Sequence, residues 1–275
     1  MAAHEECREE LMASLGLEDM TQEQMNHAMS QLLYILTYEE GAEWCEKNQV
    51  EFARPLTISN LIAADDSVIL NREFAQDFLD FYRGEAIQLD LQARRSAEAV
   101  NQWVSEQTNH LIDQAVERFE GNDAAVLCST LHFSDAWSGD EMESYPEQTK
   151  FNSPSGNVSA QYLCREDYLS CYEDDSLQAA ELNLAYGAKL TLLLPKEASA
   201  NELLASMDAK AFQQVSSQMQ SLDAQVIFPE FSVSSGVFDC RKALEQMGVP
   251  LAQEGYDSLP PCRTAYGSRW RPCPS

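Results

Sequence analysis

Basic residues are scarce in this sequence of 275 residues. Lys and Arg total 18 against 45 Asp and Glu, which gives a formal net charge of -27 and a pI near 4.3. Phosphate backbones and anionic lipid surfaces repel a protein with this charge. The composition therefore argues against nucleic-acid binding and against a role at a membrane, and its ordinary consequence is solubility.

Long apolar runs and paired cysteine motifs are also missing. The sequence has no stretch long and apolar enough to predict a membrane-spanning helix. None of its 8 cysteines forms a C-x-x-C pair, so there is no zinc or thioredoxin-type signal, and we expect mostly free, buried thiols. Residues 1–7 lack the basic start and apolar stretch of a signal peptide, so they do not predict export.

Motifs of catalysis are absent as well. The sequence contains no G-x-S-x-G, G-x-x-x-x-G-K or H-E-x-x-H pattern. Its 4 histidines fall on different predicted elements, and the adjacent carboxylates at 65–66 and 174–175 suit solvated turns better than acid-base pairs. We expect no enzyme, no cofactor and no metal site.

Helix signals are clear in the first half. Thr21 and Gln24 form a capping box ahead of a helix that runs to about residue 37. Asn71 is placed to cap a helix with a phenylalanine-rich apolar face, which Gly84 would end from the position after the last helical residue. A further helix is predicted to start at Ser96.

Strand signals come in unequal clusters between the helices. They lie at 56–62, 87–91, 189–194 and 226–229, and residues 125–133 read as a strand that is covered on both faces. Helices are predicted at 200–207 and 209–220. The elements have no fixed period, which favours an α+β fold over a doubly wound α/β fold or a solenoid.

Four stretches, at 100–112, 126–137, 182–195 and 226–248, carry motifs in a fixed order. The motif positions are Asn101, Trp103, Val104, Thr108, Ser129, Phe133, Trp137, Tyr186, Pro195, Pro229, Phe231 and Gly248. Together they resemble the serpin family of serine protease inhibitors over about residues 9–248. In order, the stretches resemble its helix F, the central strand of its sheet A, its Leu-Pro-Tyr hairpin, and its Leu-Pro-Lys-Phe strand with the following helix.

Several positions depart from the family pattern. Ser129 stands where the family has Asn, and Ser134 and Asp135 stand where it has Lys-Gly. Neither the first two helices of the family nor its Ala-rich hinge and reactive-centre loop is recognisable. We therefore expect a partial serpin domain at 1–248, with incomplete sheets A, B and C. The proline-rich residues 249–275 are expected to form a disordered tail.

The resemblance implies a suicide inhibitor of a serine or cysteine protease, whose cleaved loop inserts into sheet A as a new strand. Without a reactive-centre loop, this chain is expected to be inactive as an inhibitor, as a truncated gene model or an alternative product would be. The alternative is a non-inhibitory binding or structural product. Heparin activation is not expected, because residues 5–24 are acidic. The resemblance implies an extracellular location.

Open strand edges would also follow from the missing segments. The family's sheets A and B would lose strands here, and exposed edges favour misfolding or association. We therefore expect weak stability or aggregation.

Overall fold

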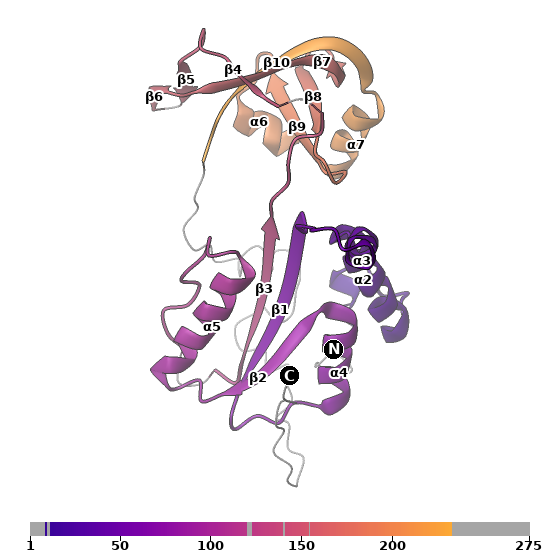
Figure 1. Ribbon diagram of the computed structural model, residues 1–275, viewed down its shortest axis with the longest axis vertical. Coiled ribbons are helices and arrows are strands. Elements are labelled where there is room, and N and C mark those ends of the chain that lie inside the picture. Colours follow the sequence, from indigo (N-terminus) through magenta and orange to yellow (C-terminus); the bar gives the residue numbers. More distant parts are fainter. Residues whose placement is uncertain (1–8, 10–11, 120–122, 140, 154, 233–275) are drawn as a thin grey trace. The chain divides into compact units, whose positions relative to one another are not determined.

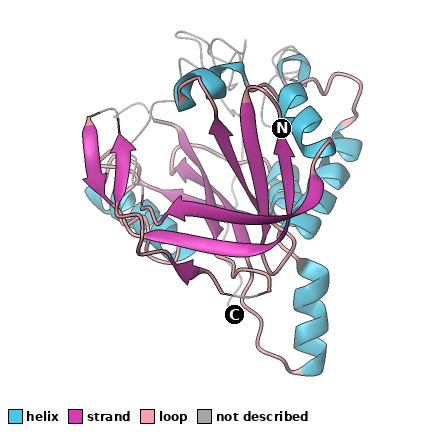
Figure 2. Ribbon diagram, turned by 90° about the horizontal axis from the view of Figure 1, so that it is seen from above, coloured by secondary structure: helices cyan, strands magenta, loops and turns pink. Residues whose placement is uncertain are grey.

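The computed structural model describes residues 9, 12–119, 123–139, 141–153 and 155–232. Helices and strands mix without a repeating order, which confirms the predicted α+β class (Figures 1 and 2). Contacts between residues divide the chain into two compact units. The first holds the described residues up to Ser134 and the second those from Asp135 onward, and each is described by itself.

The first unit contains a three-stranded sheet with β1 at its centre. β1 (Leu56–Asp65) pairs in parallel with β2 (Gly84–Leu89) and antiparallel with β3 (Ala125–Phe133). The β1–β3 ladder runs without a break from the Leu56–Phe133 pair to the Ala64–Ala125 pair.

The helices of this unit begin largely where the sequence predicts. They are α2 (Gln22–Leu36), α3 (Glu39–Asn48), α4 (Arg72–Tyr82) and α5 (Arg94–Gln107). The capping box of Thr21 and Gln24 and the Asn71 cap are both confirmed, because each side chain accepts a hydrogen bond from a first-turn amide. α3 has no side-chain cap and was not predicted.

The core of the first unit lies between its sheet and α5 (Figure 1). Leu61 and Ala63 of β1 pack there with Leu91 and with Val100 and Val104 of α5, each 4% exposed or less. Trp103, Val116, Val126 and Cys128 pack at its margin. Burial of this apolar surface is the main force that holds α5 on the sheet.

Two helix boundaries differ from the prediction. α5 begins at Arg94, because the Ser96 hydroxyl donates to the carbonyl of Asp90 at 2.6 Å instead of capping the helix. Gly84 does not end α4 by adopting left-handed backbone. Arg83 does so with φ 51°, and Gly84 is the first residue of β2.

The prediction that β3 is covered on both faces is wrong. Its side chains alternate: Leu127, Leu131 and Phe133 are 74, 63 and 46% exposed, whereas Thr130 is buried. The reason is that α5 and its core cover only the face that carries Val126 and Cys128. An apolar run alone does not distinguish this arrangement from a strand between two layers.

The second unit is built on a five-stranded antiparallel sheet. Its path is β10-β7-β8-β9, and β4 also pairs with β7. Its elements are β4 (Glu143–Ser144), β5 (Lys150–Ser153), β6 (Gly156–Ser159), β7 (Tyr162–Glu173), β8 (Leu177–Asn183), β9 (Lys189–Pro195), α6 (Ala200–Ser206), α7 (Ala209–Ser217) and β10 (Gln220–Pro229). β5 and β6 form a separate hairpin.

A carboxylate at the start of α3 forms ion pairs with two arginines that lie before β1 and at the end of α4. Glu39, at the start of α3, is 16% exposed and forms ion pairs with Arg54, at 2.6 Å, and with Arg83 at the end of α4. Burial raises the pKa of Glu39, but the hydrogen bonds from the two guanidinium groups outweigh it and leave the pKa below its ordinary value.

The Glu39→Gln variant should therefore lose stability in a pH-dependent way. Because the folded-state pKa is lowered, the stabilisation is present above the unfolded-state pKa and disappears as the pH falls through the folded-state value. We expect a loss of about 2 kcal/mol in the free energy of unfolding at pH 7, which shrinks below about pH 4. Urea titrations at several pH values measure it. Glu98→Gln, which removes the exposed Arg94–Glu98 pair, is the control and should change little.

Substitution of Gly84 tests the packing of α4 against β2. A Cβ at Gly84 would lie 2.1 Å from the Phe78 ring, so Gly84→Ala should lower the free energy of unfolding by about 1–3 kcal/mol. Adding Phe78→Leu should recover part of this loss, because the two sites share one contact. If the double variant loses as much free energy of unfolding as the two single variants lose together, the contact between Gly84 and Phe78 is not the cause.

Candidate functional site

The free edge of β3 is the most unusual feature of the first unit. Among the described strands, β3 pairs with β1 alone, so its other edge presents backbone amides and carbonyls without a strand partner. Edge strands usually carry charges, proline or a bulge that discourage further pairing. The 9 residues of β3 include no Lys, Arg, Asp, Glu or Pro, and its ladder with β1 has no bulge.

The two faces of β3 differ in character. Val126 and Cys128 face the core, and burial raises the pKa of the Cys128 thiol, which is the opposite of what an activated nucleophile needs. The face that carries Leu127, Leu131 and Phe133 is exposed. Ser129 lies on this exposed face at the middle of the strand, opposite Asn60 of β1.

Asn101 holds the segment that leads from α5 to β3. Its side-chain carbonyl accepts hydrogen bonds from the amides of Ala115 and Val116 at 2.8 and 2.9 Å, and its Nδ2 donates to the Val116 carbonyl at 2.7 Å. Thr108 adds a second tie: its hydroxyl donates to the Val104 carbonyl and accepts from the Ile112 amide. These contacts fix the return of the chain over the core.

Ser105 of α5 forms a hydrogen-bonded group with His110 and Asp113 of the same segment. The Ser105 hydroxyl donates to Asp113 Oδ1 at 3.0 Å and lies 3.0 Å from Nδ1 of His110. Because a hydroxyl has one proton, His110 must donate to Ser105 rather than accept from it. A catalytic triad needs the reverse, with the carboxylate on the histidine. We interpret this trio as a structural clasp.

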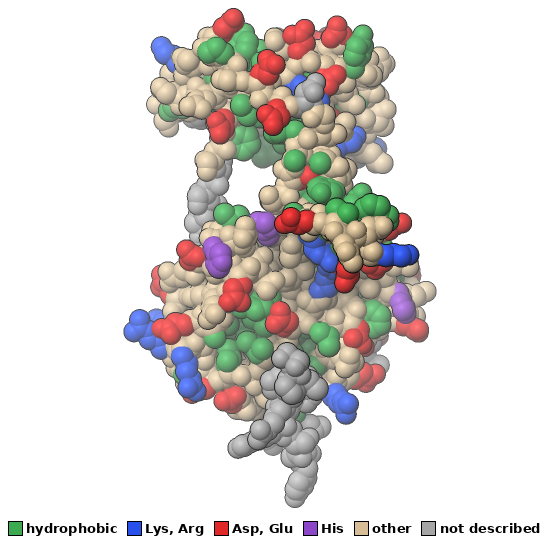
Figure 3. Space-filling model, viewed as in Figure 1, with side chains coloured by type: hydrophobic (Ala, Val, Ile, Leu, Met, Phe, Trp, Pro, Cys, Tyr) green, Lys and Arg blue, Asp and Glu red, His purple; other side chains and the backbone are tan. Residues whose placement is uncertain are grey.

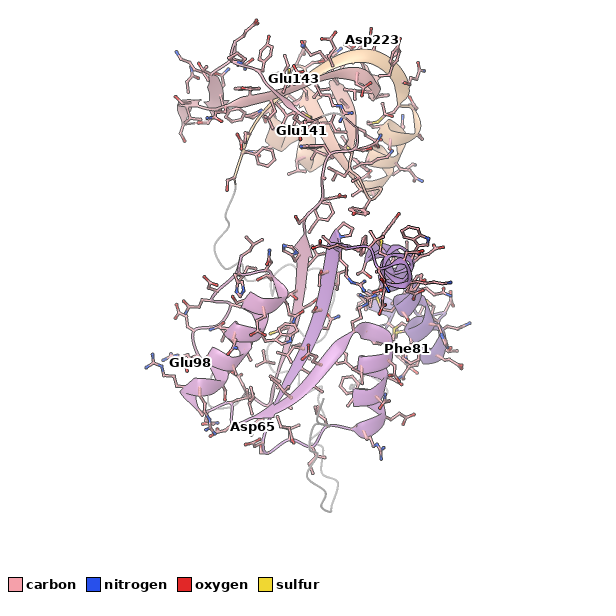
Figure 4. The ribbon with its side chains drawn as sticks, in the orientation of Figure 1. Asp65, Phe81, Glu98, Glu141, Glu143 and Asp223 are labelled. Carbon is pink, nitrogen blue, oxygen red and sulfur yellow. The ribbon has the colours of Figure 1, made fainter. Side chains whose placement is uncertain are left out.

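A pocket of about 580 Å³ lies beside this clasp. Glu98 projects into solvent from the outer side of α5 (Figure 4). The residues that line the pocket are all polar or charged: Glu98, Asn101, Gln102, Ser105, Glu106, His110, Asp113 and Gln114. Acidic side chains also predominate over the face of the molecule drawn in Figure 3. The pocket is shallow and open to solvent, so it does not enclose a ligand.

Five of the other predicted positions lie in the second unit. Trp137 packs against the cluster of Leu169, Leu182 and Phe228, with its ring 6.3 Å from that of Phe228. Tyr186 lies in the turn between β8 and β9, and Pro195 and Pro229 are the last residues of β9 and β10. Phe231 is 67% exposed. Gly248 and residues 249–275 lie outside the described residues.

No described helix has the length and hydropathy of a membrane span. Within the described ranges, no cluster of three or more His, Cys, Asp and Glu is arranged to hold a metal ion. The described cysteines, Cys45, Cys128, Cys164 and Cys171, are free thiols.

The family model for serpins, the serine protease inhibitors, matches residues 1–254. The chain belongs to the serpin family. This confirms the resemblance carried by the motifs at 100–112, 126–137, 182–195 and 226–248. The stretch that resembles the central strand of sheet A, 126–137, overlaps β3, which pairs with β1.

Curated relatives of this serpin match it at low sequence identity. It is 28% identical to an uncharacterized serpin-like protein of Thermococcus kodakarensis, covering 66% of this chain and 43% of that protein. It is 24% identical to human serpin A12, covering 74% of this chain and 50% of that protein. It is 23% identical to human corticosteroid-binding globulin, covering 70% of this chain and 49% of that protein. The chain thus spans about half the length of these relatives.

Solved serpin structures share the fold at low identity. The thermophilic serpin tengpin in its latent state matches with a TM-score of 0.73 at 18% identity, covering 90% of this chain and 64% of that one. Reactive-loop-cleaved human thyroxine-binding globulin matches with a TM-score of 0.75 at 18% identity, covering 94% of this chain and 75% of that one. These likenesses show the serpin fold.

Sequence reasoning missed the clasp and the two arginines that hold Glu39. Ser105 lies one helical turn after Asn101, and this spacing places both on one face of α5. That spacing was the available signal that one face of α5 carries the contacts to residues 110–116. Neither Arg54 nor Arg83 has a local pattern that indicates a shared partner, because Glu39 is distant from both in the sequence.

Removal of the Asn101 side chain should release the segment that it holds. We expect Asn101→Ala to lower the free energy of unfolding by about 2 kcal/mol, because it removes three hydrogen bonds to the backbone of Ala115 and Val116. Amide exchange at Ala115 and Val116 should accelerate. Gln102→Ala is the control on the same helix, since Gln102 bonds only to the exposed Glu106, and should cost far less. Equal effects of the two changes would contradict the assigned role of Asn101.

Proposed function

We propose that the β3 edge is the strand-accepting edge of a serpin-type inhibitor of serine or cysteine proteases. The observation that carries this proposal is an uncharged strand of 9 residues with an unpaired edge among the described strands. An inserted strand would complete the backbone hydrogen bonds of this edge and cover the exposed Leu127 and Leu131. Both gains favour insertion over an open sheet.

We propose further that residues 1–275 by themselves do not inhibit a protease. Their sequence has no segment that resembles the Ala-rich hinge and reactive-centre loop. The chain spans 43 to 50% of the length of the relatives named above, so the inhibitory cycle is assigned to a form that carries the loop. Such a form would act outside the cell, as the secreted relatives suggest.

A non-inhibitory binding role is the second candidate. The names of two relatives support it, since corticosteroid-binding globulin and thyroxine-binding globulin are named for the hormones they bind. The pocket beside α5 does not favour an apolar hormone here, because it is shallow and open to solvent and would leave much of such a ligand exposed. A partner would therefore bind at another surface, and the apolar face of β3 is one such surface.

The first test is the intact mass of the protein from its source, followed by reaction with a panel of serine and cysteine proteases. A native mass well above 30.9 kDa, with gel-stable adducts, is the result that the proposal expects. Recombinant residues 1–275 should give no adducts with the same panel. Proteases with a chemically blocked active-site residue are the control, because adduct formation requires their nucleophile.

Two results would contradict the proposal. One is a longer native form that gives no adduct with any protease, and this would favour the binding role. The other is adduct formation by residues 1–275 alone, which would mean that an unrecognised segment serves as bait.

A further inference from the structure

The sequence of β3 is complementary to itself. In an antiparallel pair of two copies centred on Ser129, Leu127 of one copy lies opposite Leu131 of the other, and Ala125 lies opposite Phe133. The exposed face then pairs apolar with apolar residues at every position except the centre, where two Ser129 side chains meet. On the other face, Val126 meets His132 and Cys128 meets Thr130.

No charge opposes this pairing within the strand. The 9 residues contain no acidic or basic side chain apart from His132, so the two copies place no like charges against each other. The chain as a whole has a net charge of -27, and among the other described strands all but β6 carry at least one charged side chain. Low charge and high β propensity in such a segment are the general signature of strand-to-strand association.

We infer that the partner of the β3 edge in residues 1–275 is a second copy of the same chain. The two chains pair antiparallel through β3, with the two-fold axis at Ser129, and join their three-stranded sheets into one sheet of six strands. Leu127, Leu131 and Phe133 of both copies then form one apolar strip. This inference does not depend on protease inhibition, although an inserted strand and a second copy would exclude each other at this edge.

The charge of the rest of the protein sets how the dimer responds to salt. Two chains of like charge repel each other through solvent, and added salt screens this repulsion over about 10 Å at 0.1 M ionic strength. The hydrogen bonds and apolar contacts of the β3 pair are screened much less. Dimerisation should therefore strengthen as salt is added.

Charge reversal at Ser129 tests both the partner and the register. Ser129 is exposed, so Ser129→Lys and Ser129→Glu should leave the fold intact. Each variant alone places two like charges at the axis, and we expect the dissociation constant to rise by about fivefold or more. An equimolar mixture of the two variants places opposite charges there and should restore the dimer. Sedimentation velocity of the full chain over a concentration and salt series measures this.

The Lys variant separates specific pairing from general electrostatics. It makes the chain less acidic, so non-specific repulsion would fall and association would improve, which is the opposite of our expectation. Ser221→Lys is the matched control. Ser221 is an exposed strand serine in β10 of the second unit, and its replacement carries the same change of net charge, so it should not weaken the β3 dimer.

Three results would overturn the inference. The first is a monomer at all concentrations and salt levels with rapid amide exchange in β3. The second is a monomer with slow exchange there, because another segment of the chain would then occupy the edge. The third is a dimer that neither Ser129 variant weakens. Loss of protease adducts in the longer form would leave this measurement unaffected, so the two proposals can fail separately.

Discussion

The nine-pair antiparallel ladder between β1 and β3 is the constraint on which the first unit depends. It joins segments that lie far apart in the sequence, and the chain between them must supply β2, α4 and α5 to complete the sheet and its core. A one-residue shift of this register would turn Leu61 and Ala63 away from α5 and replace them with Ile62, which is buried on the opposite face of β1. Burial of these side chains therefore fixes both the register and the position of α5.

The polar contacts of the first unit fix the path of connecting segments that apolar burial does not specify. Hydrophobic packing holds α5 on the sheet, but it does not specify the path of residues 108–119 back to β3. Asn101, Thr108 and the clasp at Ser105 specify that path through directed hydrogen bonds. In the same way, the ion pairs of Glu39 join the start of α3 to Arg54, which precedes β1, and to Arg83, which follows α4. Directed bonds of this kind select one arrangement among several of similar apolar burial.

Membership of the serpin family fixes the fold but not the activity of this chain. Relatives include serpins of unassigned role as well as hormone-binding globulins, so the family supports more than one function. Under the two proposals for this chain, an inserted strand and a second copy would satisfy the same backbone groups at the β3 edge. They would differ in the side chains that meet Leu127, Ser129 and Leu131.

Local signals in the sequence determined the α+β class, the capped starts of α2 and α4, and the motifs of the family, because caps, periodicity and motif order are properties of neighbouring residues. They did not determine that Gly84 is required by the Phe78 ring, that Ser96 bonds backwards to Asp90, or that one face of β3 is exposed. Each of these depends on which distant segment packs against the residue. Only the tertiary structure decides that, because an apolar strand has the same sequence pattern whether one or both of its faces are covered.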